Sequence, residues 1–129
     1  MKLSAHFSGH ELACKGTSCC GGTCAVDIRL VMALEDFRAA LGGRPFSPSS
    51  AFRCLVHNRA VGSDDTSQHP RGLAADIRLA DFPRTRLEEM AAAARRIPEV
   101  MGLGIYDWGI HLDVRRGTYH RVEWDHRGR

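Results

Sequence analysis

The chain has 129 residues, of which 43% are hydrophobic and 26% are charged, and this composition is that of an ordinary globular domain. Its net charge of +3 is too small to indicate a nucleic-acid partner, and no zinc-finger, helix-turn-helix or aromatic RNA-binding motif accompanies it. No stretch approaches the roughly 18 apolar residues that a membrane-spanning helix needs. We therefore expect residues 1–129 to form a single domain, a monomer that binds neither nucleic acid nor membrane.

The amino-terminal segment, residues 1–6, lacks the apolar core of a secretory signal peptide. We therefore expect the protein to be synthesised in the cytoplasm without a signal peptide. If its substrate lies outside the cell, a separate route must deliver the protein there.

Cysteines crowd the glycine-rich segment that follows, which contains Cys14, Cys19, Cys20 and Cys24, while the fifth cysteine is Cys54. An odd number of cysteines leaves a pure disulfide framework incomplete. Three or four thiolates can instead hold a second, structural zinc ion, although the spacing is not that of paired C-x-x-C knuckles. A metal site, a disulfide and free thiols therefore all stay open for the four clustered cysteines.

A helix is predicted from Asp27 to Leu41. Asp27 is a suitable N-cap, and Gly42 and Gly43 end the pattern. The apolar positions recur at helical spacing and are Leu30, Leu34, Phe37 and Leu41. This helix should pack against the core.

An extended segment is predicted over residues 44–52, because Pro45 and Pro48 both disfavour helical backbone there. The segment leads to Arg53. A short helical turn is expected after it, over residues 55–60.

Residues 62–67 are turn formers throughout, and they place His69 on a loop. Loops on a rigid scaffold often carry functional side chains. Residues 74–79 then alternate between apolar and polar, which predicts a half-buried strand with Asp76 on its polar face.

A capping-box pattern at residues 85–88 predicts a second helix, which Pro98 ends. Two further strands are predicted over residues 102–106 and 110–115. They flank Asp107-Trp108-Gly109, so we expect a hairpin with a three-residue connection.

This order of elements predicts an α+β fold. We expect a small antiparallel sheet with helices packed mainly on one face. The polar face of the sheet should stay open as a cleft.

Three side chains are suited to hold one metal ion in that cleft, and they are His69, Asp76 and His111. Imidazole and carboxylate are ordinary zinc ligands, and three protein ligands leave the fourth tetrahedral position open. Asp76 and His111 each lie on the polar side of an alternating strand, and His69 lies on the loop before the first strand. The sequence therefore favours a catalytic metal site, with surface histidines and a paired aspartate as the alternative interpretation.

Four motifs occur in order along the chain. They are S-x-x-R at residues 50–53, H-N at residues 57–58, S-x-H-x-x-G-x-A-x-D at residues 67–76 and H-x-D at residues 111–113. Together they resemble the M15 peptidases, which include D-alanyl-D-alanine carboxypeptidases, dipeptidases and phage endolysins. The resemblance covers about residues 7–124 and is closest to the small M15 domains of phages and bacteria.

The resemblance implies a fold of the hedgehog and DD-peptidase type, with a single catalytic zinc ion held by His69, Asp76 and His111. It also implies that Arg53 anchors the substrate, because a guanidinium group can hold a carboxylate bidentately or stabilise an oxyanion. A structural salt bridge is the alternative role for Arg53.

The implied reaction is hydrolysis of peptide stems of peptidoglycan, either as a D-Ala-D-Ala carboxypeptidase or as an endolysin-type endopeptidase. Holin-type release would bring such an enzyme to the cell wall without a signal peptide, by analogy with the family.

The chain departs from the M15 pattern at the general base. Better-known members have an acidic residue three positions before the last zinc histidine, and here that position is Trp108. We predict Asp107, four positions before His111, as the base, with an ordinary turn aspartate as its alternative role. Asp113 is predicted to orient a ligand or Arg53, and it is the alternative base.

Two other functions stay open. A chain that keeps its metal but lacks a competent base would be a non-catalytic wall-binding or interaction module. A zinc-thiolate redox or regulatory domain could be built on the segment from Cys14 to Cys24.

Overall fold

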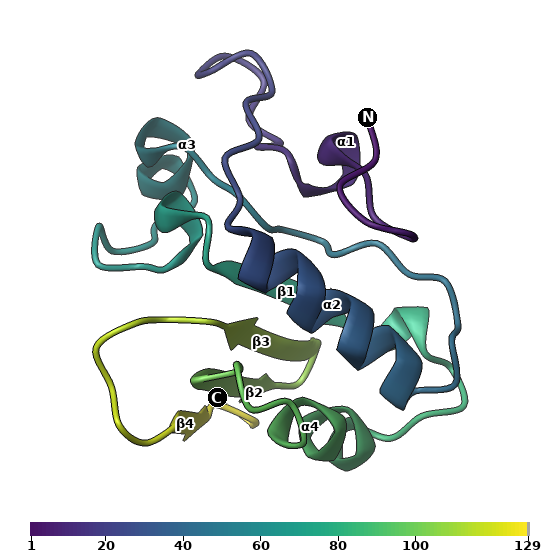
Figure 1. Ribbon diagram of the computed structural model, residues 1–129. Coiled ribbons are helices and arrows are strands. Elements are labelled where there is room, and N and C mark those ends of the chain that lie inside the picture. Colours follow the sequence, from purple (N-terminus) through teal and green to yellow (C-terminus); the bar gives the residue numbers. More distant parts are fainter. Residues whose placement is uncertain (129) are drawn as a thin grey trace.

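A four-stranded sheet with the strand order β1-β3-β2-β4 forms the centre of the fold. Its strands are β1 (Ala74–Arg78), β2 (Gly102–Tyr106), β3 (Gly109–Asp113) and β4 (Val122–Asp125). The computed structural model describes residues 1–128, and Figure 1 shows the sheet with its helices. The α+β class predicted from the sequence is confirmed.

The sheet is mixed, so the prediction of an antiparallel sheet is wrong for one strand pair. β1 and β2 both pair with β3 in antiparallel fashion, but β4 lies parallel to β2. β3 ends beside the first residue of β2, since Asp113 pairs with Gly102. Residues 114–121 then cross this end of the sheet to Val122, whose N–H donates to the Met101 carbonyl oxygen (2.8 Å). β4 therefore enters beside β2 in the direction of β2.

Four α-helices accompany the sheet within residues 1–128: α1 (Gly9–Leu12), α2 (Ile28–Ala40), α3 (Leu55–Ala60) and α4 (Leu87–Arg95). Two short 3-10 turns, η1 (His69–Arg71) and η2 (Leu79–Asp81), flank β1. α1 and α3 lie beyond the β1 edge of the sheet (Figure 1). In the described part of the chain, none of the helices has the length and apolar character needed to span a bilayer.

Alternation along the strands separates an apolar face from a polar face. The apolar face carries the cross-strand rows Ala75, Leu112 and Leu103, and Ile77, Ile110 and Ile105. These side chains belong to one buried core together with apolar residues of α2 and α4. The opposite face carries the row Asp76, His111, Gly104 and Trp124. As predicted, α2 and α4 cover the apolar face and leave the polar face for a site.

Two glycines of β2 make room for larger side chains on the polar face. A β-carbon at Gly102 would meet the carboxylate of Asp113, and one at Gly104 would meet the indole of Trp124. β2 lies between β3 and β4, so side chains from both neighbours lean over it. The polar face is therefore built mainly by side chains of β1, β3 and β4, with Tyr106 as the contribution of β2.

α2 has the predicted position and cap. The Asp27 carboxylate accepts a hydrogen bond from the Arg29 backbone N–H (2.8 Å), and the helix is followed by Leu41 as its C-cap. Leu34 and Phe37 are fully buried. The helical periodicity of the sequence was therefore sufficient to place this element.

The start of α4 differs from the prediction by one residue. Arg86 is the N-cap, and its backbone N–H donates to the Glu89 carboxylate (3.1 Å). The capping pair therefore lies one position later than the pattern at residues 85–88. An acidic residue at either position 88 or 89 suits the first helical turn, which is why the sequence did not separate the two starts.

The β2–β3 connection has two residues, Asp107 and Trp108, and not the predicted three. Gly109 pairs with Tyr106 and is the first residue of β3. A β-carbon at Gly109 would meet the Ile77 carbonyl oxygen, so the close approach of β1 requires glycine there. The glycine was interpreted as a turn residue, but it serves strand pairing.

Candidate metal centre

The three predicted metal ligands meet on the polar face of the sheet. Ligand atoms of His69, Asp76 and His111 all lie within 4.8 Å of one another. One oxygen, Asp76 Oδ1, is 3.3 Å from His69 Nε2 and 3.1 Å from His111 Nδ1. The structure therefore brings together the whole set that the sequence singled out.

Strand register places two of these ligands. Asp76 of β1 and His111 of β3 are direct cross-strand partners, so their side chains leave the sheet from adjacent positions on the same face. The outer edge of β1 is also held, because the Asp76 N–H donates to the Ser50 carbonyl oxygen (2.8 Å). Asp76 therefore lies on a strand supported from both sides.

A tight turn brings the third ligand to the same point. His69 lies in η1, and Gly72 ends this turn with φ of 72°, a left-handed conformation that favours glycine. A β-carbon at Gly72 would also meet the Ala25 carbonyl oxygen. His69 is therefore part of a buried turn and not of an open loop, and only 2% of its surface is exposed.

Each histidine is oriented by a hydrogen bond from its other ring nitrogen. His69 Nδ1 lies 2.7 Å from the Ala51 carbonyl oxygen, and His111 Nε2 lies 2.8 Å from Asp113 Oδ2. Carbonyl and carboxylate oxygens only accept, so these nitrogens donate. The nitrogens that face Asp76 are then left with electron pairs, as metal ligation requires.

Three electron-pair donors that face one point repel each other unless a cation lies between them. The donors here are two imidazole nitrogens and one carboxylate oxygen, and the set fits a zinc ion with one position left open. Without a metal ion, a proton takes this place. Burial would lower the pKa of His111, but hydrogen bonds to Asp113 and Asp76 outweigh burial and raise it above its ordinary value.

Asp113 is a fully buried carboxylate that holds His111 in place. Its oxygens accept from Arg115 Nε and from an Arg115 terminal nitrogen, both at 2.8 Å, in addition to His111. Burial would raise the pKa of Asp113, but the bonds from Arg115 and His111 outweigh it and lower the pKa to about 2. The predicted role of orienting a metal ligand is therefore what this geometry supports, and the arginine that contacts Asp113 is Arg115 and not Arg53.

The centre lies in an open cleft of about 420 Å³. One wall is the loop of residues 63–68, and the other is formed by three aromatic side chains, Tyr106, Trp108 and Trp124. The Tyr106 and Trp108 rings stack with centroids 4.9 Å apart, and Trp124 Nε1 donates to the Tyr106 hydroxyl oxygen (2.7 Å). The cleft is therefore lined both by a polar loop and by a preformed aromatic wall.

Arg53 also lines this cleft and is partly buried. Burial lowers the pKa of Arg53, while the negative charge of Asp76 opposes this effect. Its Nε atom is buried and has no hydrogen-bond partner among residues 1–128. A buried charged donor without a partner is costly, so the fold keeps Arg53 at the cleft at the expense of stability.

The predicted base is not brought to the centre. Asp107 lies in the β2–β3 turn, where its carboxylate accepts from the Gly128 N–H (3.0 Å), and Trp108 rather than Asp107 lines the cleft. Asp64 is a cleft-lining carboxylate that sequence reasoning did not single out. It lies in a run of turn residues, and nothing in the local pattern separates it from an ordinary loop aspartate.

The cysteines group differently from the predicted set. Cys14, Cys19 and Cys20 come together with Cys54, while Cys24 lies outside this group and packs partly against the core. Cys24 was predicted to belong to this group because it is near the other three cysteines along the chain. The fold instead places Cys54 next to them.

Fold and site together define a small α+β protein with a candidate three-ligand metal centre in an open cleft. Comparison with protein families matches residues 5–113 to the family described as Peptidase M15. The chain belongs to the peptidase M15 family, which supports a hydrolase with a peptidase role. No curated protein shows a significant match to the chain.

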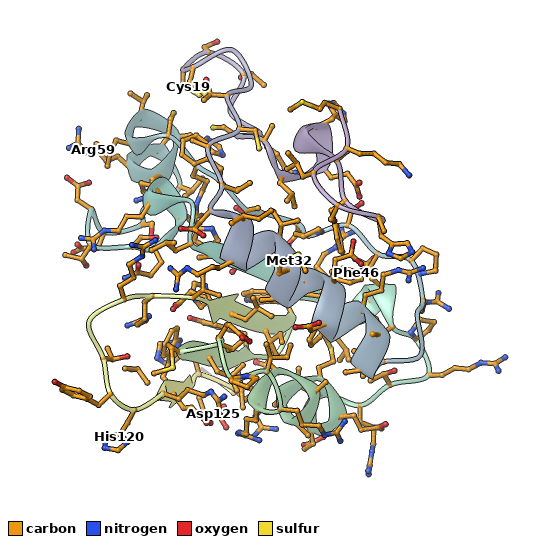
Figure 2. The ribbon with its side chains drawn as sticks, in the orientation of Figure 1. Cys19, Met32, Phe46, Arg59, His120 and Asp125 are labelled. Atoms are coloured by element: carbon orange, nitrogen blue, oxygen red, sulfur yellow. The ribbon has the colours of Figure 1, made fainter. Side chains whose placement is uncertain are left out.

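Replacement of His111 by Ala should lower the metal content by one ion per chain, because a carboxylate and a single imidazole do not complete the centre. Metal analysis after dialysis measures this loss. His120→Ala is the matched control, since His120 is exposed (labelled in Figure 2) and is not among the residues that line the cleft. An unchanged metal content in the His111 variant would place the ion elsewhere.

Replacement of Asp113 by Asn should weaken metal binding by about 10 to 100-fold, because the amide holds His111 Nε2 less firmly. A competition titration with a chelator measures the affinity. Asp36→Asn, at an exposed position of α2, should leave the affinity unchanged. Equal affinities in the two variants would remove Asp113 from the centre.

Proposed function

We propose that the chain is a zinc peptidase that hydrolyses peptide bonds in the stem peptides of peptidoglycan. The observation that carries the proposal is the convergence of His69, Asp76 and His111 in an open cleft, with both imidazoles oriented by second hydrogen bonds. Membership of a peptidase family supports the reaction class. The action is that of a D-Ala-D-Ala carboxypeptidase or of an endolysin-type endopeptidase.

When bound at this centre, Zn²⁺ would lower the pKa of water to about 7 and polarise a scissile carbonyl group. The residues of the chain supply the geometry. Asp113 keeps His111 in one tautomer, and the Ala51 carbonyl oxygen does the same for His69. The two imidazoles therefore need no rearrangement before the ion binds.

Arg53 supplies a positive charge for the substrate. Stem peptides carry carboxylates, and the planar guanidinium of Arg53, which lines the cleft, can hold a carboxylate through two parallel hydrogen bonds. The same group could stabilise an oxyanion as it develops. Arg53 therefore fixes the register of the peptide against the metal ligands.

The cleft suits a flexible, polar peptide. Its volume of about 420 Å³ lies within the usual range of roughly 300 to 1,000 Å³ for small-ligand sites. Its aromatic wall offers flat surface for the backbone and short side chains of a stem peptide, and the loop of residues 63–68 offers hydroxyl and amide groups. An open cleft also admits a substrate that is part of a polymer.

Proton transfer needs a positioned acid–base group near the reacting water, and a carboxylate can serve as one. We retain Asp107 for this role, which requires its turn to move toward the cleft, because its carboxylate now contacts the Gly128 N–H. Asp113 is a poor base, since its pKa of about 2 reflects the bonds from Arg115 and His111.

The second candidate function is a non-catalytic wall-binding module. It is favoured by one observation: the Asp107 carboxylate contacts the Gly128 N–H and the Asp113 carboxylate contacts His111, so both predicted bases are already engaged. Incubation with purified peptidoglycan separates the two functions. A peptidase releases new amines and shortened stem peptides, whereas a binding module sediments with the wall and releases none.

The substrate also bears on where the protein acts. Peptidoglycan lies outside the cytoplasm, so we propose that the chain reaches the wall after synthesis, by holin-type release. Fractionation of producing cells before and after membrane permeabilisation would test this route.

Arg53→Lys should fold normally but lose most of its turnover, because a point charge does not reproduce a planar clamp on a carboxylate. Muropeptide digestion followed by mass analysis measures the loss, and Arg53→Ala should behave alike. Arg84→Lys, at an exposed position, is the matched control. Full turnover in Arg53→Lys would leave Arg53 with a structural role.

Asp107→Asn should keep its metal and fold while turnover falls by about 10² or more, the usual scale for a positioned base. Turnover at saturating zinc measures this effect. Asp64→Asn serves as the comparison, because Asp64 is also an exposed aspartate near the cleft. If only the Asp64 variant loses turnover, the base is the carboxylate of the loop and not that of the turn.

A further inference from the structure

A second group of metal-binding side chains lies outside the cleft. Cys14, Cys19, Cys20 and Cys54 offer sulfur atoms that all lie within 4.8 Å of one another. The Sγ–Sγ distances are 3.8 Å for Cys14–Cys19, 3.9 Å for Cys14–Cys54 and 3.9 Å for Cys19–Cys20. Four thiols from two distant parts of the chain therefore share one small volume.

These distances match a tetrahedral zinc site. A Zn–S bond is about 2.3 Å long, and the edge of the corresponding tetrahedron is about 3.8 Å. A disulfide needs sulfur atoms about 2.05 Å apart, so none of the three measured pairs is bonded. We propose that Cys14, Cys19, Cys20 and Cys54 bind a second Zn²⁺ ion, and that this ion is structural.

The loop of residues 15–23, which carries Cys19 and Cys20, has little else to hold it. Residues 15–23 contain no buried side chain, and the loop extends beyond the body of the protein beside α3, with Cys19 labelled in Figure 2. Its internal bonds run from Cys14 N–H to Thr23 O (2.8 Å) and from Thr23 Oγ1 to Cys20 O (2.9 Å). Such a segment buries too little apolar surface to be fixed by packing, so a metal cross-link would supply the stabilisation that packing does not.

The surroundings of the thiols are closely fitted. A β-carbon at Gly16 would meet both Cys19 Sγ and the ring of His57, so the loop passes the cysteines only with glycine at this position. On the other side, Cys54 Sγ accepts from the His57 N–H (3.4 Å) as the N-cap of α3. The ion would thus join the loop to the start of α3.

Four thiolates would fill every position of the tetrahedron, and a closed site of this kind supports folding rather than catalysis. The ligand set differs from the sequence-based one in a single member, since Cys54 takes the place of Cys24. Cys24 therefore offers a matched control within the same loop. This second zinc site does not depend on the proposed function, because it is tested by metal content and not by peptidase activity.

The test is zinc analysis of the full chain, purified with reductant and dialysed against trace zinc. We expect two zinc ions per chain in the wild type and in Cys24→Ser, and one in Cys54→Ser and in Cys20→Ser. The double variant Cys54→Ser, His111→Ala should hold none. Loss of the ion from the cleft would leave the ion at the cysteines in place. The variants therefore distinguish failure of the cleft site from failure of the cysteine site.

Cobalt titration of the wild-type chain provides a second measurement that needs no variant. Cobalt bound by thiolates gives an intense sulfur-to-metal charge-transfer band, and this band should be present in His111→Ala and persist in Cys24→Ser. A wild type that holds one ion and shows no charge-transfer band would overturn the proposal. Intact-mass measurement without reductant, after alkylation of free thiols, gives a further test. A disulfide between two of the four cysteines, together with a zinc content of one ion per chain, would also overturn the proposal.

Discussion

The pairing of Asp76 with His111 across β1 and β3 is the contact on which the site depends. Because the two residues are direct partners, a slip of one position would turn one of them into the core. The register is held from the opposite face, where Ile77 and Ile110 pair in the buried core. Gly109 adds a steric condition, since only glycine lets β3 approach the Ile77 carbonyl oxygen. Apolar packing beneath the sheet thus fixes the polar geometry above it.

One short segment links this face to the rest of the molecule. Ser50 bridges to Asp76, the Ala51 carbonyl oxygen orients His69, Arg53 lines the cleft, and Cys54 joins the thiols. The Arg53 N–H also donates to the His69 carbonyl oxygen (3.4 Å). Four of the five residues 50–54 therefore contribute to the metal ligands, the cleft or the cysteine group. A displacement of residues 50–54 would therefore disturb the metal ligands, the cleft and the cysteine group together, because these residues are too close in sequence to move independently.

The sequence was informative where local pattern decides the structure. Alternation placed Asp76 and His111 on one face, and helical spacing placed α2, because both depend on neighbours within a few residues. The parallel course of β4, the choice of Cys54 over Cys24 and the contact of Asp107 with Gly128 were not predicted. Each joins residues about 20 or more positions apart, or depends on the path of an irregular connection. Such contacts depend on how distant parts of the chain come together, so a short stretch of sequence contains little information about them.

The aromatic wall gives the chain a spectroscopic property. The chain has two tryptophans, and both Trp108 and Trp124 line the cleft. The Trp124 ring lies 5.3 Å from the His111 ring, and the Arg115 guanidinium lies 5.5 Å from its centroid. Tryptophan emission from the folded protein therefore originates at the cleft. Occupancy of the centre by an ion or a peptide can be followed in solution by this intrinsic emission, without a label.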